Sequence, residues 1–278
     1  MQDICPNFLV IGAMKSGTTS IYKLLGNHPE INICLIKEPR FFNLEVDGQG
    51  SWELGLDWYR NLYYPAAGLT GEVSTSYTDF PEHQGVPQRI HSINAEARIV
   101  YVLRNPVDRA LSHYCHRVIM GREERLIHRA MGKGINRYIT QGMYFLQLQQ
   151  YMQLFPMKQI CVLMAENMWK NPDATKKHLA RFLEIGDFPV SSGDEMPHEN
   201  GTYAKLLGRQ HRNPLSMAQK QLWETAKDMP EGGDARALAS GLGFGTEDVL
   251  RLARRFVEDA KRLNETFGVS TDKWFPKT

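Results

Sequence analysis

The fold of this 278-residue chain is decided by residues 8–20, FLVIGAMKSGTTS. Its four leading apolar residues are typical of a buried parallel strand, and the pattern then predicts a helix over residues 18–25. Between them, Gly12 and Gly17 allow positive φ angles and a close approach of the backbone, so that N–H groups and the helix start can converge on an anion. Lys15 would add a full positive charge. The stretch therefore predicts a strand, a phosphate-binding loop and a helix, and the alternative is an ordinary turn with a solvated lysine.

This loop is not a Walker A motif. Thr18 follows Gly17 where that motif has its lysine, and Lys15 lies two residues before the glycine. The loop thus lacks the lysine that contacts the β- and γ-phosphates of ATP, and no Mg²⁺ anchor is paired with it. We expect it to bind a different phosphate ester.

Composition places the chain among ordinary globular proteins. It is 42% hydrophobic and 23% charged, with a net charge of +2, so nothing indicates a nucleic-acid partner. The longest apolar runs are only long enough for strands, and the first strand begins too early for a signal peptide. We therefore expect one domain over residues 1–278, without a membrane span and cytoplasmic; an excised lumenal catalytic domain is the alternative.

The four cysteines are scattered along the chain at Cys5, Cys34, Cys115 and Cys161. They form no Cys-x-x-Cys pair and no cluster with histidine at the spacing of metal ligands. Free thiols in a reducing compartment are the favoured interpretation.

A second anion site is predicted at the end of another strand. Residues 99–103 are apolar, and Arg104 stands at their carboxyl end, the edge where open α/β sheets bind ligands. Pro106 is suited to the first position of a helix over residues 106–117. Ser112 lies two turns into that helix, so its hydroxyl and the guanidinium could share one phosphate. The alternative is that Arg104 pairs with Asp108 at the helix start.

A carboxylate lies between two cations and two aromatic rings in residues 37–42, KEPRFF. Glu38 could be a base held near a desolvated site or one member of a surface ion-pair cluster, and the charge pattern favours neither.

The remaining pattern alternates strands and helices, which predicts an α/β fold with a P-loop-like central parallel sheet flanked by helices. Residues 121–140 are predicted to be a surface loop or short helices that could cover a site, and residues 189–213 are a predicted loop. Within the second, residues 205–212 are basic and could close a nucleotide site or be solvated. Predicted strands cover residues 31–36, 71–77 and 159–164, and predicted helices cover residues 54–64, 143–155, 171–182, 217–226 and 246–267.

Three motifs stand in the order and approximate spacing found in sulfotransferases. They are KSGTT at residues 15–19, KEPRFF at residues 37–42, and RNP at residues 104–106 with Ser112. The chain resembles the sulfotransferases that use 3′-phosphoadenosine 5′-phosphosulfate (PAPS), most closely the heparan-sulfate branch and its bacterial relatives. The resemblance extends from Phe8 to the end of the chain, through GLDWY at residues 55–59, GEVSTSY at residues 71–77 and the closing residues 267–274.

The resemblance implies a role for each matching residue. Glu38 would be the general base, with His113 or His116 next, and Lys15 would steady the bridging oxygen as the sulfuryl group leaves. No metal would be required, and the product would be 3′-phosphoadenosine 5′-phosphate (PAP). The implied cofactor contacts are Lys15, Ser16, Gly17, Thr18 and Thr19 at the 5′ end, and Arg104, Ser112, Gly208 and Arg209 at the 3′-phosphate.

The chain departs from the heparan enzymes in its cleft. Val73 and Leu207 stand where those enzymes have lysines, and the cysteines of their disulfide are missing. Fewer cations favour a smaller hydroxylated acceptor, such as a sugar, lipid or secondary metabolite, over a polyanionic glycan. A nucleotide or small-molecule kinase with an atypical P-loop, and a non-catalytic nucleotide-binding module, are the rival functions.

Overall fold

A computed structural model describes residues 5–45, 48, 50–65, 68–132, 134–189, 216–227 and 234–275. These residues form two compact units. The first contains the described residues up to 104 and those from 144 to 189, and the second contains the described residues from 105 to 143 and from 216 onward. That residues 1–278 make up one domain stays a prediction.

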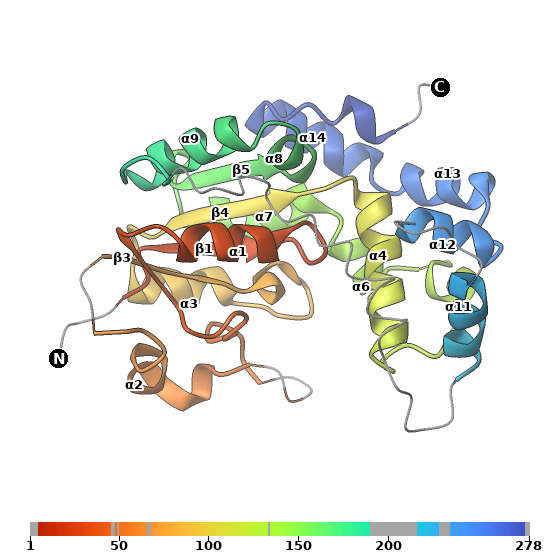
Figure 1. Cartoon of the computed structure of the whole chain (residues 1–278), viewed down its shortest axis with the longest axis horizontal. Helices are drawn as coiled ribbons and strands as arrows, with labels where there is room; N and C mark the ends of the chain where they lie inside the picture. The colour runs from red at the N-terminus through yellow and green to blue at the C-terminus, as the bar shows by residue number, and fades with distance from the viewer. Residues whose placement is uncertain are drawn as a thin grey trace. The chain divides into compact units, whose positions relative to one another are not determined.

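The first unit is built on a five-stranded sheet whose strand pairs are all parallel (Figure 1). The strand order is β2-β3-β1-β4-β5, and all five residues of β1 are buried. The predicted α/β fold with a parallel sheet is therefore confirmed. The strands are β1 (Phe8–Gly12), β2 (Ile31–Ile33), β3 (Leu69–Val73), β4 (Arg98–Leu103) and β5 (Ile160–Met164).

One face of this sheet is covered by α1, α8 and α9. Phe8 and Val10 of β1 pack with Ile21 of α1, Met168 of α8 and Leu179 of α9 in one buried cluster. Side chains alternate along a strand, so the other residues of β1 point to the opposite face. The helices of this unit are α1 (Thr18–Gly26), α2 (Gly55–Arg60), α3 (Val86–Ile93), α7 (Tyr144–Met152), α8 (Ala165–Lys170) and α9 (Pro172–Leu183), with short 3₁₀ turns η1 (Trp52–Leu54), η2 (Thr75–Thr78) and η3 (Met157–Gln159).

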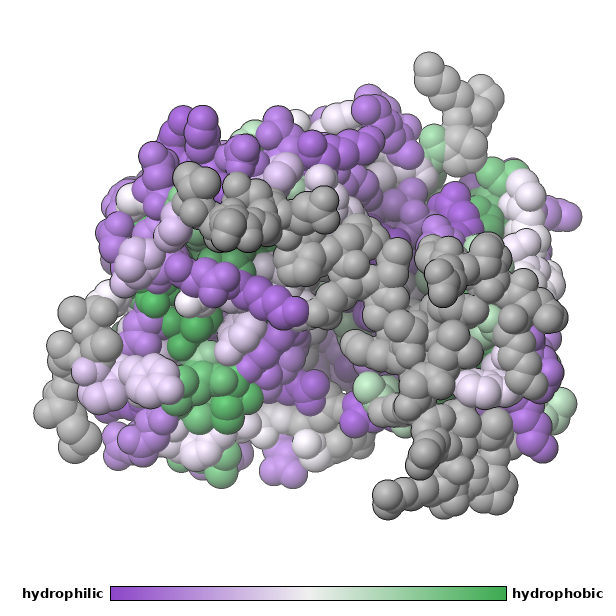
Figure 2. Space-filling model, viewed as in Figure 1, coloured by the Kyte–Doolittle hydropathy of each residue, from purple (hydrophilic) through white to green (hydrophobic). Residues whose placement is uncertain are grey.

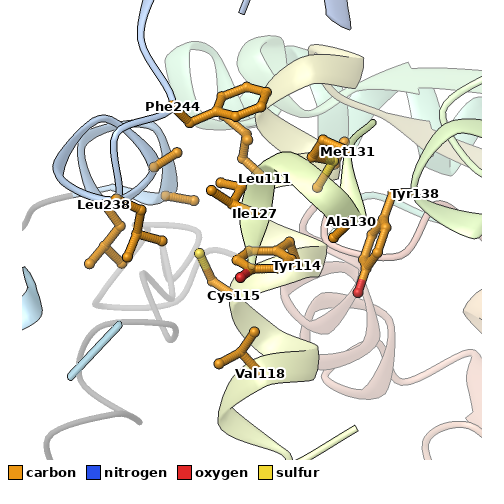
Figure 3. Packing of buried hydrophobic residues seen from close by; sticks show 14 of the residues in the cluster. Leu111, Tyr114, Cys115, Val118, Ile127, Ala130, Met131, Tyr138, Leu238 and Phe244 are labelled. Carbon is orange, nitrogen blue, oxygen red and sulfur yellow. The ribbon is translucent and has the colours of Figure 1, made fainter. Parts of the chain in front are cut away.

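The second unit is helical and packs around α4 (Pro106–Ile119). Leu111, Tyr114 and Val118 of α4 lie in a buried apolar cluster that also holds Ile127 and Phe244 (Figure 3). Its other helices are α5 (Ile127–Ala130), α6 (Arg137–Thr140), α11 (Met217–Lys227), α12 (Ala235–Gly241), α13 (Thr246–Arg254) and α14 (Val257–Phe267), followed by the 3₁₀ turn η4 (Asp272–Trp274).

The start of α4 is fixed by Asn105. Its side-chain oxygen accepts hydrogen bonds from the N–H groups of Val107 and Asp108, and its amide donates to the carbonyl of Trp274 at 2.9 Å. Pro106 is the first helical residue, where its missing N–H has no cost. The sequence Asn-Pro thus begins this helix as predicted.

Several predicted boundaries were wrong. The predicted strand over residues 31–36 ends at Ile33, and the one over residues 71–77 ends at Val73, where the chain turns into η2. The predicted helix over residues 246–267 is two helices, since the chain breaks at Phe256 and buries this ring completely. The apolar spacing continues across that break, which is why periodicity alone does not reveal it.

No helix in the described part of the chain is long and apolar enough to cross a membrane. All four cysteines are free, as predicted, and three of them are buried.

Truncating the core of the second unit should destabilise the protein. Leu111 is fully buried, so Leu111→Ala should lower the free energy of unfolding by roughly 2–5 kcal/mol through lost burial and the cavity that remains. Urea unfolding followed by circular dichroism would measure the loss. Ile135→Ala is the control, because Ile135 is 78% exposed and its truncation should change stability little. Equal losses for the two variants would contradict the proposed packing.

Candidate functional site

The loop after β1 has the geometry of an anion-binding site. The N–H of Ala13 donates to the carbonyl of Val102 at 2.7 Å, which ties the loop to β4, and Lys15 adopts a left-handed φ of 69°. Ser16 is fully buried, and its hydroxyl has no hydrogen-bond partner among the residues that the structure describes. A buried hydroxyl without a partner is costly, so its place in this loop fits a bound ligand.

Gly17 is required where the loop enters α1. It has a φ of 86°, and an added Cβ would lie 3.1 Å from Cζ2 of Trp169. The first N–H groups of a helix have no partner inside it, and Gly17 has no side chain to cap them. Thr18 and Thr19 are the first two residues of α1, so their N–H groups are among these donors at the helix start. Backbone donors, the helix dipole and the Ser16 hydroxyl together suit a phosphate or sulfate ester.

Arg104 lies next to this loop. Its Nη1 donates to the carbonyl of Lys15 over 3.4 Å, and its own carbonyl accepts a 2.7 Å hydrogen bond from the hydroxyl of Tyr144. The sheet is parallel, so the carboxyl ends of β1 and β4 meet at one edge. The guanidinium of Arg104 therefore lies against the backbone of the loop that carries Lys15, at the end of the sheet.

Glu38 is held by the segment that follows β3. Its carboxylate accepts hydrogen bonds from the N–H of Thr75 at 2.8 Å and from the hydroxyl of Thr75 at 3.0 Å. Lys37 forms an ion pair with this carboxylate at 2.9 Å, and the backbone N–H of Glu38 donates to the carbonyl of Val73. The side chain remains 20% exposed, so it is fixed yet accessible to an incoming molecule. The same edge of the sheet thus holds a carboxylate beside the anion-binding loop.

Comparison with known proteins identifies the family. The sulfotransferase domain matches residues 6–195. The chain belongs to the sulfotransferase family. The resemblance seen in the sequence is confirmed, and the members of this family are enzymes that transfer sulfuryl groups.

The curated relatives are enzymes of the heparan-sulfate branch. This sulfotransferase is 26% identical over 200 residues to the human bifunctional heparan sulfate N-deacetylase/N-sulfotransferase 2 and 28% identical over 214 residues to the bifunctional heparan sulfate N-deacetylase/N-sulfotransferase of Drosophila melanogaster. The alignments cover 67% and 66% of this chain, but only 23% and 20% of those relatives. The chain thus spans about a quarter or less of their length.

A solved structure shares the fold over nearly the whole chain. The sulfotransferase from Alicyclobacillus acidocaldarius superimposes with a TM-score of 0.64 at 24% identity, covering 98% of this chain and 99% of that one. The parallel sheet with flanking helices is therefore the sulfotransferase fold.

Three other predicted site residues are not among the described residues of the first unit. Ser112 belongs to the second unit, on α4, where it is buried. Gly208 and Arg209 lie outside the described residues. The cofactor contacts inferred for these three residues remain predictions. The sequence left open whether Asp108 pairs with Arg104. In the structure Asp108 forms an ion pair with Arg236 at 2.6 Å instead.

The histidines named as substitute bases are in the second unit. Burial lowers the pKa of His113 well below its usual range, and the nearby guanidinium of Arg109 lowers it further. His113 is therefore neutral at physiological pH, and it is almost completely buried on α4.

A carboxylate that the sequence did not single out lies directly beneath the Glu38 segment. Glu72 is fully buried within β3 and accepts hydrogen bonds from the hydroxyls of Tyr59, Tyr77 and Ser74 at 2.9–3.0 Å. One signal was available, because both faces of a parallel sheet are covered, so a glutamate on one of its inner strands is expected to be buried. What the sequence does not reveal is which distant side chains satisfy it.

Burial raises the pKa of Glu72 from its usual 4.5 to about 7. The three hydroxyl donors oppose this shift, and the nearby carboxylate of Glu38 adds to it. Because the unfolded chain releases this proton near pH 4.5 and the folded protein near pH 7, the folded state binds more protons between these values. The stability that Glu72 contributes is full below pH 4.5 and is lost as the pH rises through 7.

Glu72→Gln should remove this pH dependence. The variant stays neutral at both pH values, whereas wild-type Glu72 becomes charged between them. The difference in free energy of unfolding between variant and wild type should therefore shift by roughly 3 kcal/mol in favour of the variant from pH 5 to pH 8.5. Urea unfolding at both pH values would measure the gain. A variant whose stability follows the wild-type pH profile would show that Glu72 does not titrate in this range.

Glu123→Gln is the matched control. Glu123 is also buried, but hydrogen bonds from Arg125 and Tyr138 outweigh the effect of burial and lower its pKa to about 2. Its contribution is therefore complete throughout this pH range, so the variant should lose the same stability at pH 5 and at pH 8.5.

Proposed function

We propose that this enzyme transfers the sulfuryl group of PAPS to a hydroxyl of a carbohydrate, lipid or secondary-metabolite acceptor, with an amine as a second choice. The observation that carries this proposal is the contact between Arg104 and the Lys15 loop. PAPS carries charge at two points of one adenosine, its 5′-phosphosulfate and its 3′-phosphate. Arg104 and the loop that carries Lys15 lie at one edge of the sheet, so together they suit a ligand with two charged ends. A single phosphate site would contact only one of these ends.

The loop would hold the reacting end of the donor. Sulfuryl transfer is an in-line displacement at sulfur, so negative charge grows on the oxygen that bridges sulfur and phosphorus. The ammonium of Lys15 and the N–H groups at the start of α1 would stabilise that charge without being rearranged during the reaction. Arg104 would bind the 3′-phosphate, joined by Ser112 and by the backbone of Gly208 with Arg209.

Glu38 would accept the proton of the acceptor hydroxyl. A hydroxyl is a poor nucleophile at neutral pH, and a positioned base within hydrogen-bond reach accelerates such steps by roughly 10²–10⁴-fold. The two hydrogen bonds from Thr75 hold this carboxylate in one orientation. Because it stays partly exposed, an acceptor can reach it.

The surface before Glu38 supports an acceptor with an apolar part. Leu35 and Ile36 are 47% and 48% exposed and directly precede the Lys37–Glu38 pair. Figure 2 shows hydrophobic surface in the lower left of the view, over the orange segment around α2 of Figure 1. An exposed apolar surface at this position favours a lipid or secondary metabolite over a polyanionic glycan.

Ligand-induced stabilisation tests the donor. PAP should raise the melting temperature without magnesium, by roughly 5–10 °C at 100 times its dissociation constant, because it binds only the folded protein. ATP without magnesium should have a much smaller effect. Differential scanning fluorimetry would measure both, and stabilisation by magnesium-ATP but not by PAP would favour the kinase instead.

Glu38→Gln should separate catalysis from binding. We expect kcat to fall by roughly 10²–10⁴-fold, since the amide cannot accept the proton, while PAP affinity remains that of wild type. Arg104→Ala is the complementary variant and should weaken PAP binding by roughly 10- to 100-fold through the loss of a charge-assisted hydrogen bond. Calorimetric titration and turnover with radiolabelled PAPS would measure these effects. Wild-type turnover by Glu38→Gln would assign the base to another residue.

A further inference from the structure

We propose that Glu72 is a positioning residue that fixes the segment carrying Glu38 through the hydroxyls of Ser74 and Tyr77. This inference rests on the proposed role of Glu38 as the base. It adds a residue that touches no substrate but sets where the base stands.

The hydroxyls of Ser74 and Tyr77 each connect Glu72 to the Glu38 segment. The Ser74 hydroxyl donates to Glu72 Oε2 at 3.0 Å and accepts from the N–H of Arg40 at 3.1 Å. The Tyr77 hydroxyl donates to Glu72 Oε1 at 2.9 Å and accepts from the N–H of Phe42 at 3.2 Å. Arg40 and Phe42 follow Glu38 by two and four residues, so two links join the buried carboxylate to the segment.

The negative charge of Glu72 sets the direction of these links. A carboxylate only accepts hydrogen bonds, so the hydroxyl hydrogens of Ser74 and Tyr77 both point toward it. The oxygen of each hydroxyl is then left to accept a hydrogen bond from a backbone N–H of the Glu38 segment. The protonated carboxyl of Glu72, or the amide of Gln in its place, would bring a donor of its own. The hydroxyls would then no longer be forced to accept from the Glu38 segment.

The Glu38 segment needs such support because of its backbone. Glu38 and Arg40 have φ angles of 65° and 55°, in the left-handed region that side chains other than glycine disfavour. Strained residues of this kind persist where surrounding contacts determine them. The hydrogen bonds of Thr75 fix the Glu38 carboxylate itself, whereas those of Ser74 and Tyr77 fix the backbone that follows it.

The groups facing Glu72 are neutral donors and one other carboxylate. Tyr59 and Tyr77 donate to it directly, and Tyr63 donates to Tyr59 at 2.7 Å, because the single hydroxyl hydrogen of Tyr59 is directed to Glu72. Burial raises the pKa of each of these tyrosines well above its usual value, so they remain protonated. The other titratable groups that act on Glu72 or feel its charge are Cys34, Tyr151 and Glu38.

The central experiment is the pH profile of Glu72→Gln. At pH 8.5, where wild-type Glu72 is ionised, we expect kcat to fall roughly 10- to 100-fold, the size expected for a misplaced catalytic group, with PAP affinity unchanged. Because the wild-type carboxyl becomes neutral below its pKa of about 7, the ratio of wild-type to variant kcat should approach 1 at pH 5.5. The rate would be followed as PAP release from PAPS with the acceptor mixture that gives the highest wild-type turnover.

Two further variants test one link by itself and provide a matched control. Ser74→Ala breaks one link without changing the carboxylate and should lower kcat while retaining PAP affinity. Tyr114→Phe removes a comparable hydroxyl, which donates to the carbonyl of Arg125 in the second unit, and should leave kcat unchanged. Urea unfolding of Glu72→Gln at pH 8.5 shows whether the variant is folded under the assay conditions, so that loss of folded protein is not mistaken for a lower rate.

The outcomes separate this proposal from the proposed function. A Glu72→Gln variant that keeps the wild-type rate at pH 8.5, or that loses the same factor at every pH, would overturn the positioning role and leave the function intact. If wild type transfers no sulfuryl group, the proposed function fails, and if Glu38→Gln stays active, the role of Glu38 as the base fails. Hydrogen exchange of residues 36–45 still tests the links in that case: faster exchange in Glu72→Gln supports them, and unchanged exchange overturns them.

Discussion

The parallel pairing of β1 between β3 and β4 is the constraint on which the site depends. Val10 pairs with Val73 and Gly12 with Tyr101, so the three strands end at one edge of the sheet. Parallel strands need no strained connection to bring their carboxyl ends together, because their common direction does so. The anion-binding loop, Arg104 and the segment that holds Glu38 each begin where one of these strands stops.

The close approach at the end of β1 depends on glycine. An added Cβ at Gly12 would collide with the hydroxyl of Thr78, which itself donates to the carbonyl of Ile11. The turn η2 can therefore lie directly against the strand end. η2 also contains Thr75, which binds the Glu38 carboxylate, and Tyr77, which binds the backbone after it. The contact of η2 with the end of β1 therefore fixes how far these two residues lie from the sheet.

Local features of the sequence predicted the loop between β1 and α1 and the place of Arg104 after β4. Each depends on a strand, a breaker and a helix that follow one another within about fifteen residues, so periodicity and turn chemistry are sufficient. The surroundings of Glu72 could not be predicted in this way. Tyr59 and Tyr77 lie on different elements, and only the folded sheet brings their hydroxyls to one carboxylate. The break at Phe256 was missed because tertiary burial overrides a continuous helical pattern.

The choice of partners for Glu72 has a physical consequence. A lysine or arginine beside it would lower its pKa and stabilise the fold, but it would also attract the carboxylate of Glu38, which already pairs with Lys37. Neutral hydroxyls satisfy the buried oxygens without competing for that second carboxylate. Tyr59 contributes further by stacking on Phe41 with ring centroids 4.3 Å apart, which packs the Glu38 segment against the same network. The buried charge of Glu72 costs the fold stability, and it organises the strained segment that carries Glu38. A loss of stability in return for function is expected at an active site.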